Sequence, residues 1–170
     1  MPYPAQHDIH SINAHGMAYY RPVSNGGTMT QSDYLTLLDI KPFFRSEFVQ
    51  VKARFERLRE QLESSAGVSA NWDSYGAEAP SAVAITNARR VLVRLESRSL
   101  LPARIVPSAE GGIGFCFLEE DKYADIECLN SNETLAVKYR GQEQPDVWEI
   151  GSSDDSLLEA IERIRVHLSI

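Results

Sequence analysis

The chain has little cysteine and lacks any long hydrophobic run. Its two cysteines, Cys116 and Cys128, are too few for a disulfide framework and lack the spacing of a zinc site or a redox pair, so we expect buried, reduced thiols. No stretch approaches the roughly 18 to 20 apolar residues that a membrane span needs. The first residues, MPYPAQHDIH, have neither the basic start nor the apolar stretch of a secretion signal. These absences favour a cytoplasmic protein that does not enter a membrane.

Positive charge is also scarce. The 170 residues include 17 Lys and Arg against 24 Asp and Glu, which gives a formal net charge of −7. Phosphate contacts need concentrated Lys and Arg, so the balance argues against a nucleic-acid-binding protein. An acidic surface suits solubility, or a basic protein partner. With 43% apolar residues, the chain is long enough for one well-buried core and an extension.

Catalytic motifs are missing as well. Neither cysteine follows a predicted strand-to-helix turn, there is no G-x-S-x-G tract, and His167 lies near the end of the last predicted helix. The glycines at 111 and 112 precede a predicted strand, so they lack the helix N-terminus that makes a phosphate cradle. The sequence therefore predicts no enzyme and no cofactor.

Two groups of potential metal ligands are better explained without a metal. The acidic run at 119–121 falls where a hairpin turn is expected, whereas Mg²⁺ and Ca²⁺ sites usually draw ligands from several segments. Three histidines in the first 15 residues are not accompanied by a carboxylate or Cys group in a rigid element: His7, His10 and His15. We predict no metal site.

Residues 1–41 are predicted to form a loosely ordered N-terminal arm. Three of the eight prolines and a Ser-Asn-Gly-Gly turn at 24–27 lie there, without a sustained hydrophobic period. Within the arm, residues 33–40 are too apolar to stay in solvent and should dock on the same domain or on a partner. Ser32 or Asp33 could cap a single helical turn that Pro42 ends, or Pro42 could open the next helix. The candidate docking residues are Tyr34, Leu35, Leu37 and Leu38.

A long amphipathic helix is predicted from Phe43 to about Gly67. Its apolar residues recur at intervals of 4, 3, 4, 3 and 4, which places them on one helix face. This seam either packs on the core of its own domain, which its phenylalanines favour, or forms a coiled coil, as a homodimer with a second copy or with another protein, through Phe44, Phe48 and Phe55. The seam residues are Phe44, Phe48, Val51, Phe55, Leu58 and Leu62.

Two more helices and a set of short strands complete the predicted domain of residues 42–170. Ser81 should cap a helix whose apolar stripe runs from Ala84 to Leu95, and Asp154 or Asp155 should cap the last helix. Between them, alternating apolar residues predict strands near 105, 113–117, 124–128, 135–139 and 146–150. The fold class is α+β, an antiparallel four- to five-stranded meander sheet with helices packed on one face.

One strand pairing can be specified further. A two-residue turn at Asn132 and Glu133 would place Glu127 opposite Lys138 and Asp125 opposite Arg140. One face of this hairpin would then be apolar and the other would carry opposite charges in register.

The stretch NWDSYGAEAP at 71–80 is the strongest candidate site. Trp72, Asp73 and Tyr75 lie in a loop between two predicted helices, and loop aromatics are typical interface anchors. The structural alternative is a joint in which Trp72 fills the gap between helices, Asp73 accepts hydrogen bonds from backbone amides, and Gly76 adopts a conformation that other residues avoid.

Three tracts resemble a recurrent group of small bacterial proteins without an established activity: NWDSYGAEAPS, PARIVPSAEGGIGFCF and YADIEC. That group carries a Trp-Asp-x-x-Gly-Ala tract, a Pro before a helix, a Pro-x-Ile-x-Pro strand, a Gly-Gly-Ile or Gly-Glu-Ile strand and an alternating Ile-Glu strand. The similarity covers about residues 71–168, and this chain has Cys116 and Phe117 where the group often has Glu-Trp. The resemblance implies an α+β fold and a stand-alone cytoplasmic protein, and it implies no activity.

These observations support two hypotheses of function. The first is a non-catalytic protein-binding module that regulates or neutralises a partner, of the antitoxin, immunity or phage-defence inhibitor type, using the 71–80 loop and the apolar segment 33–40. The alternative is a small-ligand-binding protein or an enzyme with a pocket near the 71–80 loop, using Asp73, Tyr75 and either Tyr123 or Glu127.

Overall fold

A computed structural model describes the backbone of residues 31–169 and the side chains of residues 49–169. The chain separates into two units, Met1–Phe43 and Phe44–Ile170. Most of the predicted arm, and the side chains of the candidate docking segment 33–40, lie outside the described residues. The elements in chain order are α1 (Gln31–Ala66), α2 (Ala82–Ser97), β1 (Arg104–Ser108), β2 (Gly112–Glu119), β3 (Lys122–Leu129), β4 (Thr134–Arg140), β5 (Asp146–Glu149) and α3 (Asp154–Leu168).

Helix α1 is continuous from Gln31 to Ala66, so Pro42 does not end a separate helical turn, and that prediction is wrong. Its seam packs on its own domain where the side chains are described, because Phe55, Leu58 and Leu62 are buried in the core. Phe55 is only 1% exposed and is therefore not available as an oligomer seam. Phe44 and Phe48 precede the described side chains.

The other two helices form as their stripes predict, with one difference at a cap. The Ser81 hydroxyl accepts a hydrogen bond from the Ala84 amide at 3.2 Å, and residues from Ala84 to Leu95 bury the stripe of α2. Ser153, rather than Asp154 or Asp155, caps α3 by accepting from the Ser156 amide at 3.1 Å. The two aspartates lie in the first turn, where the helix dipole stabilises negative charge.

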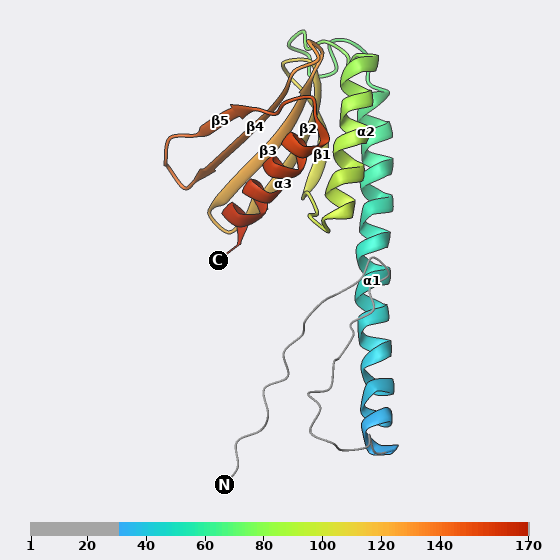
Figure 1. The fold of residues 1–170 in the computed structure, drawn as a ribbon. Coiled ribbons are helices and arrows are strands. Elements are labelled where there is room, and N and C mark those ends of the chain that lie inside the picture. Colours follow the sequence, from blue (N-terminus) through green and yellow to red (C-terminus); the bar gives the residue numbers. More distant parts are fainter. Residues whose placement is uncertain (1–30, 170) are drawn as a thin grey trace. The chain divides into compact units, whose positions relative to one another are not determined.

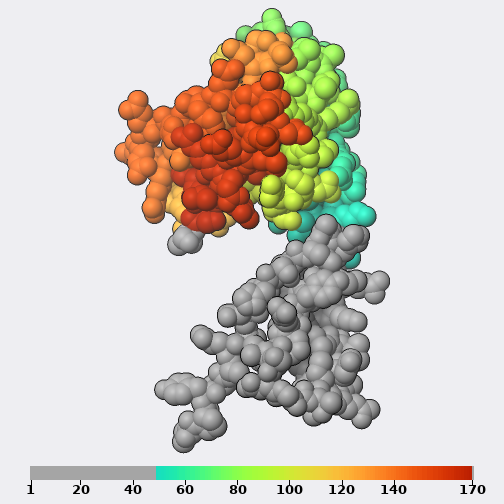
Figure 2. All heavy atoms as spheres, viewed as in Figure 1, coloured from blue at the N-terminus to red at the C-terminus, as the bar shows by residue number. Residues whose placement is uncertain are grey.

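The five strands form one antiparallel sheet in the order β1-β2-β3-β4-β5, which confirms the predicted meander and fold class (Figure 1). Side chains on one face of the sheet share a single hydrophobic core with all three helices. A row through the middle of this face pairs Ile105 with Phe115, Phe115 with Ile126, and Ile126 with Ala136. Figure 2 shows α3 lying over this face.

The end of α3 is fixed to the sheet by polar contacts. The Lys122 ammonium, which is buried, donates to the Ser169 carbonyl at 2.8 Å, where a cation complements the helix C-terminus. The His167 ring nitrogen Nε2 lies 3.1 Å from the carbonyls of both Tyr123 and Tyr139. These contacts hold α3 across β3 and β4.

The predicted register of the β3–β4 hairpin is wrong by three residues. Asp125 pairs with Val137 and Glu127 pairs with Leu135. The turn has three residues, since Leu129 N donates to the Glu133 carbonyl and Asn132 adopts a φ of 76°. A three-residue loop that ends in a left-handed residue is a common hairpin connection. Because the shift is odd, every side chain of β4 points to the face opposite to the one predicted.

Candidate functional site

The side of the sheet that faces away from the helices is the candidate site, and we call it the open face. The strand registers place the side chains of β4 at 135, 137 and 139 on it, together with those of β3 at 123, 125 and 127. None of these side chains belongs to the hydrophobic core that the helices cover. The open face further includes Arg104, Val106, Ser108, Gly112, Gly114, Cys116, Leu118, Leu129, Val147 and Glu149.

Strand β4 presents its larger apolar side chains to the open face. Leu135, Val137 and Tyr139 are half-buried there, whereas the same strand turns Thr134 and Ala136 toward the helices. The flanks of the face are more accessible: Leu118 at the end of β2 is 64% exposed and Val147 on β5 is 59% exposed. With the observed register, these apolar side chains form a surface on the open face instead of belonging to the core, as the predicted register would have them.

Asp125 lies near the centre of this apolar surface. The Tyr123 hydroxyl donates to Asp125 Oδ2 at 2.9 Å and lies 3.8 Å from Cys116 Sγ. The Tyr123 ring stacks on Tyr139 with 4.9 Å between centroids. Burial raises the pKa of Asp125 above its usual value, and the charge of Glu127 adds to this, while the Tyr123 bond opposes it. Burial also raises the pKa of Tyr123, so its hydroxyl stays protonated and donates.

Glu127 is the second carboxylate of the open face, two residues along the same strand. The Ser108 hydroxyl donates to Glu127 Oε1, and Ser108 Oγ accepts from the Glu110 amide at 3.1 Å. Ser108 is buried at the end of β1, so the glutamate is held by a fixed donor. Each carboxylate therefore has one oxygen bonded to a neutral hydroxyl of its own chain.

The cations that the predicted register placed opposite these carboxylates lie elsewhere. Lys138 points to the helix side and contacts Asp146 at 3.6 Å. Arg140 pairs with Asp121 at 2.9 Å at the end of the sheet. Within residues 49–169, neither Asp125 nor Glu127 forms an ion pair.

Strand β2 places two glycines, Gly112 and Gly114, on the open face near Glu127. Gly112 has a φ of 139°, and a β-carbon there would lie 2.1 Å from the Cys128 carbonyl oxygen, so the backbone requires glycine. Gly114, which pairs with Glu127, has no such requirement, because its nearest neighbour would be Val106 Cγ2 at 3.8 Å. Gly114 is itself buried, and the Glu127 side chain extends across β2 beside it to reach Ser108 on β1.

The 71–80 loop is a tightly bonded turn. Asp73 Oδ1 accepts from the amides of Tyr75 at 2.8 Å and Ala77 at 3.1 Å, and Asn71 Oδ1 accepts from the Gly76 amide at 2.9 Å. The amide bonds, led by that from Tyr75, lower the pKa of Asp73. Gly76 has a φ of 95°, as a joint requires. Asp73 and Gly76 therefore have the hydrogen bonds and the backbone conformation that were predicted for a structural joint.

The two aromatics of this loop lie outside the hydrophobic core. Tyr75 is 93% exposed and Trp72 is 37% exposed. The interpretation that Trp72 fills a gap between helices stays a prediction, and so does the availability of both aromatics to a partner.

Asn130 joins this loop to the sheet, and sequence reasoning missed it. Its Oδ1 accepts from the Ser81 amide at 2.7 Å, and its Nδ2 donates to the Ala79 carbonyl at 3.0 Å. Its backbone amide donates to the Gly111 carbonyl at 3.0 Å. One side chain therefore connects the entry of α2 to the β3–β4 turn, and its position in a turn after a strand was the available signal.

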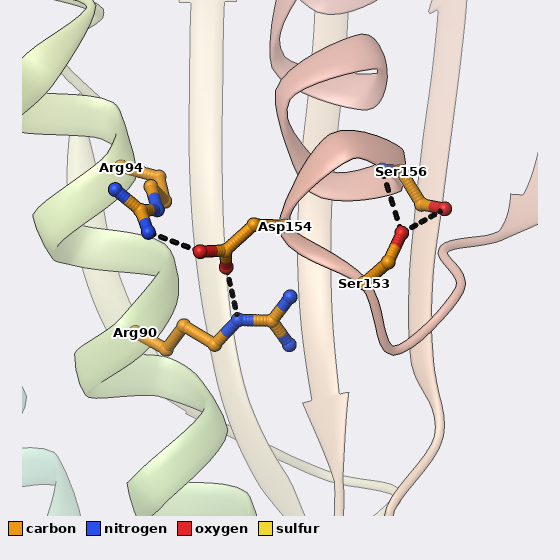
Figure 3. A network of polar contacts seen from close by, with 5 residues as sticks. All are labelled: Arg90, Arg94, Ser153, Asp154 and Ser156. Carbon is orange, nitrogen blue, oxygen red and sulfur yellow. Dashed lines mark hydrogen bonds and ion pairs between the residues drawn. The ribbon is translucent and has the colours of Figure 1, made fainter.

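A hollow on the helix side is lined mainly by polar residues. It measures about 310 Å³ and opens between α2, the β3–β4 turn and the start of α3. Its one arginine, Arg90, is bonded to Asp154 at 2.9 Å, and Arg94 bonds to the same carboxylate (Figure 3). Asp154 thus links α2 to α3 and compensates the charge of Arg90.

Among the side chains of residues 49–169, no three His, Cys, Asp or Glu converge as a metal site would need. No helix within residues 31–169 is long and apolar enough to cross a membrane. Both cysteines are buried free thiols, as predicted, and burial raises the pKa of Cys128 to about 12.

Comparison with known proteins found no matching family model, no matching curated protein and no matching solved structure. The function of the chain is therefore inferred from its fold and from the open face.

Proposed function

We propose that this chain is a non-catalytic module that binds a partner protein through the open face of its sheet. The observation that supports it best is the orientation of β4, whose three larger apolar side chains all point away from the helices. Antiparallel sheets with one solvated face usually carry polar residues there. An apolar open face is typical of a surface that another molecule covers.

The face also has the composition of an interface centre. It combines two tyrosines, which bury a large area at low entropic cost, with branched aliphatic side chains. Val147 and Leu118 at its flanks are mostly exposed, so the apolar area extends across the sheet. Regulation or neutralisation of the bound partner, as an antitoxin, immunity protein or defence inhibitor would achieve, is the function that we assign to this binding. Trp72 and Tyr75 are candidates for a second contact.

The test compares two exposed valines on opposite sides of the domain. Val147 on the open face is 59% exposed, and Val93 on the outer side of α2 is 56% exposed. The tagged full chain, Val147→Arg and Val93→Arg are expressed in native cells, cross-linked and purified. We expect the wild type and Val93→Arg to recover the same stoichiometric protein, and Val147→Arg to lose it. Equal recovery with all three chains would show that the open face is not the binding surface.

A further inference from the structure

The two carboxylates of the open face restrict what can cover it. Asp125 and Glu127 are half-buried among apolar side chains and have no cation partner in residues 49–169. A partner that covered them with apolar surface would bury two charges without compensation, which is strongly unfavourable. The partner must therefore bring positive charge to this point of the face.

Each of the two carboxylates keeps one oxygen free for a cation. Tyr123 bonds Asp125 Oδ2 and Ser108 bonds Glu127 Oε1, while Oδ1 and Oε2 make no hydrogen bond within the described side chains. Side chains two residues apart on a strand share a face at about 6.6 Å separation. A guanidinium group has five donors on a planar fork and can bond both carboxylates.

The surroundings favour arginine over lysine. The stacked pair Tyr123 and Tyr139 lies beside Asp125, and Val137 pairs with it. Guanidinium is less strongly hydrated than ammonium and stacks on aromatic faces, so it loses less on entering such a site. The same chain shows this geometry elsewhere, because the Arg163 guanidinium lies 3.9 Å from the centroid of the Trp148 ring.

We infer that the partner protein is basic at its contact and that one of its arginines binds Asp125 and Glu127. The inference rests on the proposed function and specifies its partner. A two-fold interface with a second copy would offer these carboxylates only Arg104 of the edge strand β1 as a cation among the described open-face residues, so a separate basic partner is the better occupant. The net charge of −7 agrees with a basic partner.

The experiment titrates N-acetyl-L-arginine amide into the full chain and follows the carboxyl carbons of Asp125 and Glu127 by NMR. We expect saturable shifts at both, and about tenfold or more weaker binding of the neutral analogue N-acetyl-L-citrulline amide and of N-acetyl-L-lysine amide. Shifts that do not saturate, or equal binding of citrulline or lysine amide, would overturn the inference.

The control compares two double variants, each of which removes two negative charges. Asp125→Asn with Glu127→Gln keeps the shape of the site, and Asp155→Asn with Glu159→Gln removes the same charge from exposed positions of α3. Binding of arginine amide, followed at the backbone amides of β3, should weaken about tenfold or more in the first and stay unchanged in the second. Equal binding to both would also overturn the inference. Thermal melting of each variant verifies its fold.

The outcomes separate this inference from the proposed function. If Val147→Arg loses the captured protein while arginine amide does not bind, protein binding stands and the arginine site is wrong. If arginine amide binds but capture does not depend on Val147, the proposed function is wrong. A homodimer detected by sedimentation and abolished by Val147→Arg would overturn the basic partner in favour of a second copy.

Discussion

Strands β2 and β4 direct their large apolar side chains to opposite faces of the sheet. Strand β2 turns Ile113, Phe115 and Phe117 toward the helices and, apart from Leu118 at its end, leaves only small residues on the open face. Strand β4 does the reverse, with Ala136 inside and Leu135 among the residues outside. The helices therefore account for the hydrophobicity of β2 but not for that of β4. We therefore interpret the helix-covered face as the stabilising face of the sheet and the open face as the proposed binding face.

The largest effect should come from breaking the helix-covered face. Phe115→Ala removes a fully buried ring and should lower the free energy of unfolding by about 3–5 kcal/mol. Leu118→Ala, on the same strand but 64% exposed on the open face, should change it by no more than about 0.5 kcal/mol. Urea denaturation of both variants measures the difference. Similar losses would mean that the open face is also part of the stabilising core.

A second pair of variants tests the open side of β2. Gly112→Ala forces a side chain into a φ of 139° and against the Cys128 carbonyl, so we expect a loss of at least about 1–3 kcal/mol. Gly114→Ala meets only ordinary contacts, and should change stability by less than about 1 kcal/mol in either direction. Thermal and urea unfolding compare the two. A destabilised Gly114→Ala would show that packing at this position requires glycine.

The sequence predicted the helices, the strand order and the core of β2 because each has one strong period. It failed at β4, where Leu135, Val137 and Tyr139 alternate as a core strand would but point outward. Hydrophobic alternation identifies which residues share a face, and it cannot say which face the helices cover. Asn132, which tolerates the left-handed conformation, was the local signal for the three-residue turn.

The candidate site was therefore only partly predictable. Tyr123 and Glu127 were named as alternatives, but Asp125 was assigned a cation partner that the true register removes. Ser108 and Gly114 join the site through β1 and β2, and only the sheet register brings them together. The roles of Trp72 and Tyr75 depend on a partner and stay predictions.

Asp125→Asn should show that this open-face residue is not retained for stability. Burial raises the pKa of Asp125, so the folded state binds its proton more tightly than the unfolded state, and ionisation at neutral pH disfavours folding. Asparagine keeps an acceptor for Tyr123 without the charge. The variant should therefore be at least as stable as the wild type at pH 7, and any advantage should disappear as the pH falls below the ordinary Asp pKa of about 3.9. A less stable variant at pH 7 would assign Asp125 a structural role.

Asp154→Asn should show the opposite sign on the helix side, with a small effect because the group is exposed. Arg94 and then Arg90 hold the pKa of Asp154 below its usual value, so its ionised form favours the folded state. The wild type should be the more stable chain above the ordinary Asp pKa of about 3.9, and this advantage should be lost as the pH falls through the lower folded-state value. In a chain that already carries Arg90→Gln and Arg94→Gln, the Asp154→Asn change should have almost no effect, since the partners are gone. Urea unfolding across this pH range measures both backgrounds, and an equal effect in the two would mean that Asp154 acts through the first turn of α3 and not by linking α3 to α2.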